Sequence, residues 1–219
     1  MQLKSAETIT ILIVDDHPIA RAGIRYLLSQ AGDFAIVGEA QNGFETKVLI
    51  PKLHPKILLL DLKMPGPRPC EIEKWIRENY PETITLILTS HDRDAYLSTM
   101  MDAGVAGYLG KEETAEKLIV AIRRAATGTI YFNDEQITRA LNWKQEVKRR
   151  WDGLTSRERE LLQYLASGKD NRAIALSLNI TTKTVEFHIT NILRKLNMSS
   201  RDEAIVWLLE HHPDDPDIN

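Results

Sequence analysis

The chain has 219 residues, of which 43% are hydrophobic and 27% are charged, with 28 basic against 31 acidic side chains. This composition excludes wholesale disorder, and the length suggests one large domain or two small ones. A single cysteine, Cys70, excludes an internal disulfide framework. No apolar run approaches the ~20 residues of a membrane span and no secretory signal is evident, so we expect a cytoplasmic protein with no membrane segment.

The first half of the chain alternates short β-rich runs with longer amphipathic stretches. The predicted strands are 8–16, 34–40, 56–62, 83–90 and 107–111. The predicted helices that follow them are 17–32, 44–53, 71–79, 94–104 and 114–128, with a loop at 64–69. Five such units in succession predict an α/β doubly wound, flavodoxin-like fold with a five-stranded parallel sheet. In such sheets, ligands bind beyond the carboxyl ends of the strands.

The second half has a different character. Residues 129–150 are polar and rich in Lys and Arg, and we interpret them as a linker with some helix. The predicted helices beyond it are 156–168, 171–179, 181–197 and 201–212. They are too few to cover a sheet, so they predict a separate small all-α domain. The predicted boundaries are 8–128, 129–150, 151–212 and a tail at 213–219.

The charge is distributed unevenly between these parts. Residues 148–212 carry 11 basic and eight acidic side chains, although the whole chain has a net charge of −3. This local excess hints at a polyanionic partner, but a solvated charged surface explains it equally well.

Polar side chains stand at the ends of the predicted strands. Asp15 and Asp16 end the first strand, Asp61 the third, Thr89 the fourth and Lys111 the fifth. Any one of these residues alone is an ordinary polar residue of a turn. Together, three carboxylates, a hydroxyl and an ammonium on one rim predict a Mg²⁺ site for phosphoryl transfer. We expect the Lys111 amine to lie on an exposed part of that rim, where little stability depends on it.

Four segments strengthen this interpretation: ILIVDDHP, LLLDLKMPG, ILTS and GYLGK. They resemble the receiver domain of two-component response regulators, and the resemblance covers about 9–128. It implies that Asp61 accepts a phosphoryl group from a sensor histidine kinase. It also implies that Asp16, Asp61 and the backbone carbonyl of Lys63 bind Mg²⁺, with Asp15 ordering the ion through water.

The same resemblance assigns the remaining rim residues. Lys111 would pair with the acyl phosphate, and Thr89 would hydrogen-bond to it after moving inward. Tyr108 would be the aromatic that changes rotamer on activation, although an ordinary buried tyrosine is the alternative. Lys63 and His91 stand where receivers tune the lifetime of the phosphoryl group, and ordinary surface variation is equally possible there.

One loop departs from the receiver pattern. Pro67-Arg68-Pro69 stands where the family usually has a hydrophobic residue, Asp and Gly. The two prolines stiffen the loop, and we expect the arginine to add a positive charge close to the acidic cluster.

The C-terminal helices have helix-turn-helix form. Thr181 or Thr182 can N-cap the second helix, whose start is the part that reads base edges in such motifs. Its core-facing positions are Val185, Ile189, Ile192 and Leu196. Its opposite face carries Lys183, Glu186, Phe187, Thr190, Asn191 and Arg194. Any amphipathic helix has a polar stripe, so this pattern alone leaves DNA binding open.

Residues 154 to about 207 resemble the LuxR-type helix-turn-helix of the NarL/FixJ class, through LTSRE, the ASG turn, TVEFH and the KLN end. The resemblance implies base contacts from Glu186, Phe187 and Thr190. It implies phosphate contacts from Lys183, Asn191, Arg194 and Lys195. Glu158 would be the core-facing partner of a helix arginine.

The leading hypothesis is therefore a non-enzymatic, phosphorylation-controlled transcription factor that binds paired half-sites of double-stranded DNA as a homodimer. Ile205, Trp207 and Leu208 would supply part of the dimer contact or pack within the domain's own core. The alternative is a receiver that acts mainly as a protein-interaction switch with weak DNA binding. A flavodoxin-like cofactor enzyme is disfavoured because the chain lacks a glycine-rich phosphate loop.

Overall fold

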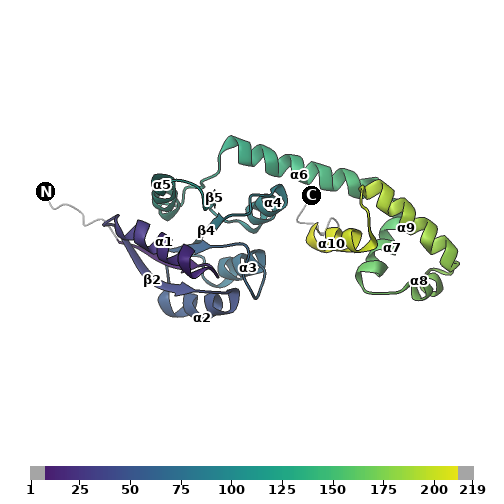
Figure 1. Cartoon of the computed structure of the whole chain (residues 1–219), viewed down its shortest axis with the longest axis horizontal. Helices are drawn as coiled ribbons and strands as arrows, with labels where there is room; N and C mark the ends of the chain where they lie inside the picture. The colour runs from purple at the N-terminus through teal and green to yellow at the C-terminus, as the bar shows by residue number, and fades with distance from the viewer. Residues whose placement is uncertain (1–7, 212–219) are drawn as a thin grey trace. The chain divides into compact units, whose positions relative to one another are not determined.

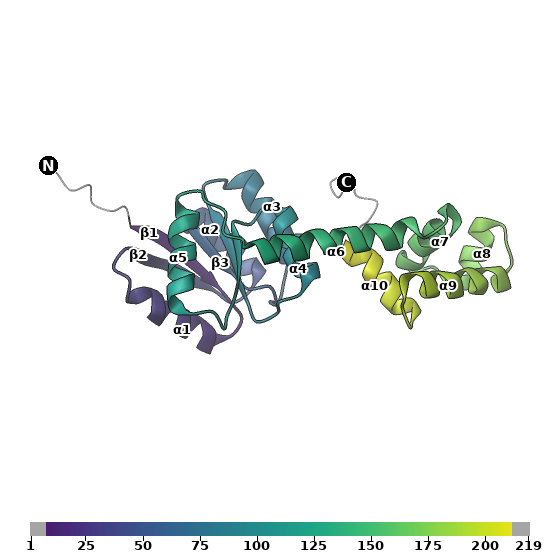
Figure 2. The ribbon, with the colours of Figure 1, turned by 90° about the horizontal axis from the view of Figure 1, so that it is seen from above.

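The computed structural model describes residues 8–211. The chain forms two compact units that divide between Ala140 and Leu141. Figure 1 labels the helices and most of the strands, and Figure 2 labels β1 and β3. Within the described residues, no helix combines the length and the apolar character that crossing a membrane requires.

The N-terminal unit is built on a five-stranded parallel sheet with strand order β2-β1-β3-β4-β5. The strands are β1 (Ile9–Val14), β2 (Phe34–Ala40), β3 (Ile57–Leu60), β4 (Ile84–Thr89) and β5 (Gly107–Gly110). Because the strand order reverses direction at β1, the carboxyl ends of β1 and β3 meet at the point where such folds place their ligands. The predicted doubly wound sheet is confirmed.

Helices cover both faces of this sheet, which explains why its central strands are apolar on both sides (Figure 2). One face packs against α2 (Gly43–Leu53), α3 (Pro69–Asn79) and α4 (Asp94–Ala103). The other face packs against α1 (Pro18–Ser29) and α5 (Ala115–Ala126). Strand β1 shows the alternation directly, because Leu12 and Val14 belong to the first core and Ile11 and Ile13 to the second.

The stiff proline loop ends earlier than predicted. Helix α3 begins at Pro69 instead of residue 71, because the fixed φ of proline and its missing N–H suit the first turn of a helix. The backbone N–H of Arg68 donates to Glu71 at 3.2 Å, and its guanidinium Nε donates to the same carboxylate at 2.7 Å. The positive charge that we expected to act on the acidic cluster is therefore paired with a carboxylate of α3.

The segment 129–150 is more ordered than the predicted linker. It contains most of a single 19-residue helix, α6 (Asp134–Asp152). Ala140 of this helix is buried in a core of the N-terminal unit, whereas Val147 and Trp151 are buried in the core of the C-terminal unit. Before the helix begins, Tyr131 forms an isolated parallel bridge with Gly107 of β5.

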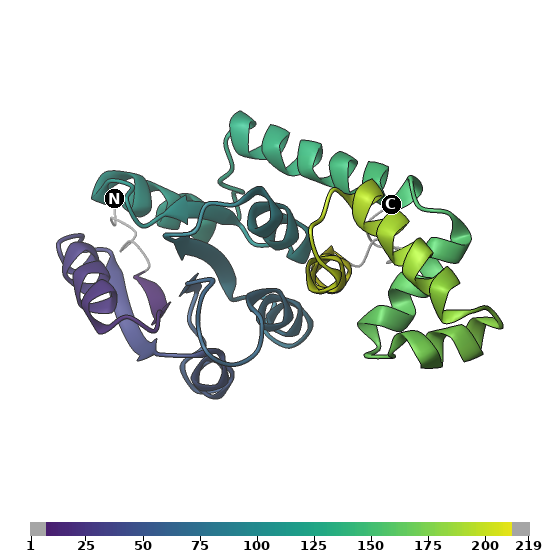
Figure 3. The same cartoon turned by 45° about the vertical axis from the view of Figure 1, so that its right-hand side comes forward.

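The C-terminal unit continues with the helices α7 (Ser156–Ala166), α8 (Asn171–Leu178), α9 (Thr182–Leu196) and α10 (Arg201–His211), which run from green to yellow in Figure 3. Asn179 follows the last residue of α8, and its φ of 51° lies in the left-handed region. The chain then reaches Thr181, whose hydroxyl accepts a hydrogen bond from the Thr184 N–H at 3.1 Å and caps α9. The predicted helix-turn-helix is present, with Thr181 as the cap.

Helix α10 resolves the two roles left open for its apolar residues. Trp207 and Leu208 are 5% and 8% exposed within the unit's own core, and Ile205 packs against that core. Core packing is therefore confirmed for Trp207 and Leu208, whose burial leaves little surface for a dimer contact. Ile205 is half-buried, and its dimer contact stays a prediction. Val206 and Leu209 are the exposed apolar residues of this helix, at 48% and 46%. The predicted tail at 213–219 lies outside the described residues.

Candidate functional site

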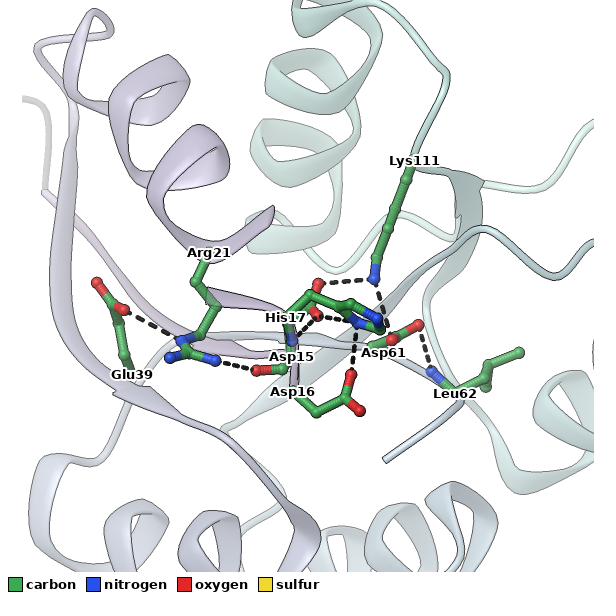
Figure 4. Close-up of polar contacts among 8 residues, drawn as sticks. All are labelled: Asp15, Asp16, His17, Arg21, Glu39, Asp61, Leu62 and Lys111. Atoms are coloured by element: carbon green, nitrogen blue, oxygen red, sulfur yellow. Dashed lines mark hydrogen bonds and ion pairs between the residues drawn. The ribbon is translucent and has the colours of Figure 1, made fainter. Parts of the chain in front are cut away.

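The predicted carboxylates converge at the carboxyl edge of the sheet (Figure 4). Val14 of β1 pairs with Leu60 of β3, so Asp15 and Asp61 leave the sheet side by side. The two are 1% and 3% exposed, whereas the side chain of Asp16 is 34% exposed. The Asp61 carboxylate accepts the Leu62 N–H at 2.8 Å, which fixes one of its oxygens.

Lys111 reaches into this cluster from the end of β5. Its Nζ lies 2.7 Å from Asp15 Oδ2 and 3.0 Å from Asp61 Oδ2. The side chain is only 17% exposed, so the expected position on an exposed rim is wrong. Burial disfavours its cation, but the contacts with both carboxylates outweigh burial and raise the pKa of Lys111. Lys111 therefore stays charged and partly neutralises the cluster.

The cluster has the donor chemistry of a hard-cation site. Ligand atoms of Asp15, Asp16, His17 and Asp61 lie within 4.8 Å of one another. Two buried carboxylate oxygens, Asp15 Oδ2 and Asp16 Oδ1, have no hydrogen-bond partner among the described residues and meet only side-chain nitrogens as ion pairs. Carboxylate oxygens in excess over cations suit Mg²⁺. Lys63 follows on the next loop with an exposed side chain, and its carbonyl as a ligand stays a prediction.

The remaining switch residues are joined by hydrogen bonds. Thr89 is fully buried, and its Oγ1 accepts the His91 N–H at 3.1 Å. Tyr108 is 3% exposed and donates its hydroxyl to the His91 carbonyl at 2.9 Å. Burial, with Asp92 nearby, raises the pKa of Tyr108 above its ordinary value, so this hydroxyl stays protonated and donates. The backbone of His91 therefore links the two side chains.

In the C-terminal unit, helix α9 buries Val185, Ile192 and Leu196 and packs Ile189 against the same core, as predicted. The predicted DNA-contacting residues divide by exposure. Lys183, Glu186, Phe187, Thr190 and Arg194 are exposed, whereas Asn191 and Lys195 are half-buried. Phe187 is 64% exposed, so its ring is accessible to a partner surface.

Both units of the chain match known protein families. Residues 11–123 match the family described as response regulator receiver domain, and residues 152–208 match bacterial regulatory proteins of the luxR family. The chain is 35% identical to the nitrate/nitrite response regulator protein NarL of Escherichia coli K12, over 94% of this chain and 97% of NarL. This chain belongs to the response regulators.

Solved structures of another response regulator support the same assignment. RcsB from Salmonella enterica serovar Typhimurium, bound to promoter rprA in the presence of phosphomimetic BeF3-, matches with a TM-score of 0.66 and 27% identity. The match covers 93% of this chain and 99% of that one. A structure of two RcsB dimers bound to two parallel DNAs matches with a TM-score of 0.67 and 27% identity, over 94% and 99% of the chains.

One predicted DNA contact of this response regulator has a structural partner. The Nζ of Lys195 lies 2.7 Å from Glu158 Oε2, and Glu158 is 4% exposed. The same carboxylate accepts the N–H and the hydroxyl of Thr155 at 2.8 and 3.0 Å. Burial disfavours the carboxylate, but Lys195 and Thr155 outweigh burial and lower the pKa of Glu158. The predicted partner was an arginine, and the structure shows a lysine instead.

Two residues at the acidic cluster escaped the sequence analysis. His17 donates its N–H to Asp15 Oδ1 at 2.9 Å, and its Nδ1 lies 2.6 Å from Asp16 Oδ1. Arg21 donates to the backbone carbonyl of Asp15 at 2.6 Å and lies 3.4 Å from Glu39 (Figure 4). His17 was detectable from its place next to the acidic pair. Arg21 was not, because its contact depends on how the first helical turn folds back over the loop.

Proposed function

We propose that Asp61 accepts a phosphoryl group from a sensor histidine kinase and that this transfer controls DNA binding by the C-terminal unit. The observation that carries the proposal is the buried pair Asp15 and Asp61 with the Lys111 ammonium between them, on a chain that also folds a helix-turn-helix. We assign 8–128 to the receiver, 129–150 to the linker and 151–212 to the DNA-binding domain. The relatives support this reading, because RcsB has been solved with a promoter and a phosphomimetic.

The transfer needs little covalent chemistry from the protein. The P–N bond of a phosphohistidine donor breaks as an Asp61 oxygen forms the new P–O bond, and the leaving imidazole nitrogen keeps the electron pair and takes up a proton. Lys111, 3.0 Å from Asp61 Oδ2, is placed to offset the charge of the phosphoryl oxygens. Mg²⁺, held by Asp15, Asp16, Asp61 and the Lys63 carbonyl, would supply further charge neutralisation when bound. The Thr89 hydroxyl would then hydrogen-bond to the phosphoryl group.

The exposed face of α9 is the proposed DNA-binding surface. Near the helix start, Glu186, Phe187 and Thr190 would contact base edges in the major groove. Lys183, Asn191, Arg194 and Lys195 would contact phosphates. The Thr190 hydroxyl donates to the Glu186 carbonyl at 3.0 Å, so it can accept a hydrogen bond from a base as it stands but must rotate to donate one. We propose that the protein binds paired half-sites of double-stranded DNA as a homodimer, with the exposed Val206 and Leu209 of α10 available for the dimer contact.

Labelling and DNA binding together test this function. Incubation with acetyl phosphate and Mg²⁺ should add one phosphoryl group to the wild-type protein, visible by intact-mass spectrometry, and none to Asp61→Asn. Labelled protein should bind its DNA more tightly, with an affinity that falls steeply as salt is raised. Undiminished labelling of the variant would refute the acceptor, and labelling that survives chelation would refute the metal. Labelling with no salt-dependent DNA binding would favour a protein-interaction switch instead.

A further inference from the structure

Arg139 joins the first turns of α6 to two aspartates of the receiver. Arg139 donates its Nε to Asp94 Oδ1 at 2.7 Å and its two terminal nitrogens to the oxygens of Asp92, both at 2.8 Å. A guanidinium that engages one carboxylate with both terminal nitrogens has a fixed geometry, which a lysine ammonium cannot reproduce. The Arg139 side chain is 27% exposed, and the side chains of Asp92 and Asp94 are 48% and 43% exposed, so the contact lies at the surface.

Neighbouring residues of α6 add to this contact. Gln136 donates its side-chain amide to the Tyr108 carbonyl at 2.9 Å, and Ala140 is 2% exposed within the receiver core that includes Tyr108. Arg139 is therefore one part of a docked surface that extends over the first two turns of the helix. Burial of Ala140 stabilises the docked helix, and the contacts of Arg139 depend on the positions of Asp92 and Asp94.

Asp92 lies on the loop that the switch residues hold, and Asp94 begins α4 at the end of that loop. Asp92 follows His91 directly, and His91 is bound on one side by Thr89 Oγ1 and on the other by the Tyr108 hydroxyl. If Thr89 turns towards a phosphoryl group on Asp61, its oxygen leaves the His91 N–H. The loop then loses one of its two anchors, and the position of Asp92 relative to Arg139 changes.

We propose that Arg139 latches the first turns of α6 to the β4–α4 loop in the unphosphorylated protein, and that phosphorylation of Asp61 opens this latch by moving the loop. The release rests on the proposed function of Asp61, whereas the latch itself does not. Exposed ion pairs contribute little, but here one cation meets two carboxylates through three hydrogen bonds. We expect opening of the latch to raise the amide exchange rate of the docked turns about five- to thirtyfold. This lies within the usual range of allosteric coupling between two sites.

Amide hydrogen exchange of the full chain at residues 137–140 tests the latch. Without phosphodonor, Arg139→Ala should accelerate exchange there about five- to thirtyfold. The double variant Asp92→Asn/Asp94→Asn should do the same from the other side of the contact. Arg139→Lys should be intermediate. Arg149→Ala, which removes a 77% exposed arginine paired with Glu146 on the same helix, is the matched control and should change nothing at 137–140.

Acetyl phosphate with Mg²⁺ then tests the release. Wild-type protein should gain the acceleration seen in Arg139→Ala, Asp61→Asn should stay slow, and phosphorylated Arg139→Ala should gain nothing further. Exchange in unphosphorylated Arg139→Ala equal to that of wild type would overturn the latch. Slow exchange in wild-type protein shown by intact mass to carry the phosphoryl group would overturn the release. Failure of wild type to take up phosphate would refute the acceptor and the release together, while the unphosphorylated comparison still decides the latch.

Discussion

Replacing Lys195 by alanine should destabilise the C-terminal unit, because it leaves the Glu158 carboxylate buried without its cation. Glu158 is 4% exposed, and the ion pair spans 2.7 Å. Removing one partner of a buried pair costs about 3–5 kcal/mol. Here Lys195 is 28% exposed and Thr155 still donates two hydrogen bonds to the carboxylate, so we expect a loss of about 1–3 kcal/mol.

The loss should depend on pH in a defined direction. The folded pKa of Glu158 is lowered, so its contribution is present above the unfolded value of about 4.3 and disappears as pH falls through the folded pKa. Alanine at 195 removes the cation and leaves only the Thr155 hydrogen bonds to oppose burial, so the pKa of Glu158 should rise relative to wild type. The difference in unfolding free energy between wild type and variant should therefore be largest near neutral pH and shrink below about pH 4.

Thermal unfolding followed by tryptophan fluorescence measures this loss. In a Trp75→Phe background, the remaining tryptophans, Trp143, Trp151 and Trp207, all lie in the C-terminal unit, so the signal reports that unit alone. For a unit of this size, 1 kcal/mol corresponds to about 4–8 °C. Arg194→Ala, an exposed position on the same helix, is the control and should stay within about 0.5 kcal/mol.

Two results would refute the reasoning. A Lys195→Ala midpoint equal to that of Arg194→Ala would mean that the pair with Glu158 stabilises nothing. A loss that does not change with pH would mean that it comes from packing of the lysine stem and not from charge. The salt dependence of DNA binding by Lys195→Ala is a second readout. If Lys195 contacts a phosphate, its loss should lower the slope of log binding constant against log salt concentration by ~1.

Three further predictions follow from the same structure. Lys111→Ala should destabilise the receiver by about 1–3 kcal/mol in the absence of Mg²⁺, because it leaves two buried carboxylates without their cation. Urea titrations measure this loss, and added Mg²⁺ should reduce it. Phe187→Ala should alter the sequence preference in binding-site selection, at a cost of ~1–3 kcal/mol for one base pair, whereas Lys183→Ala should weaken binding to all sequences alike. Unchanged preference in Phe187→Ala would mean that α9 docks on DNA in another orientation. Asn179→Ala should cost ~1 kcal/mol of stability and Asn179→Gly less, because the residue has a φ of 51°; equal losses would contradict this.

The sequence predicted the fold and most of the receiver site because both follow from the order of the strands. Once five βα units were recognised, Asp15, Asp61 and Lys111 had to end at the same edge of one parallel sheet. What the sequence could not supply is how deep each side chain lies. Lys111 appeared exposed because it follows a short strand near a loop, and only the folded β1 and β3 ends show that its ammonium lies between two buried carboxylates.

The contacts that escaped prediction join residues far apart in the chain. Arg139 meets Asp92 across an interval of 47 residues, and Lys195 meets Glu158 across 37. Helical periodicity places each residue on a face of its own helix but does not say which element packs against that face. The continuous helix α6 was detectable in principle, since Ala140, Val147 and Trp151 recur at helical spacing, but its many charged residues obscured the pattern.

We propose that phosphorylation of Asp61 controls DNA binding by this protein. Genome-wide footprinting of wild type beside Asp61→Asn, with both proteins at equal abundance and the kinase active, tests it most directly. We expect a set of occupied sites with paired half-sites in the wild type, and a marked loss of occupancy at those sites in the variant. Identical occupancy in the two strains would contradict it.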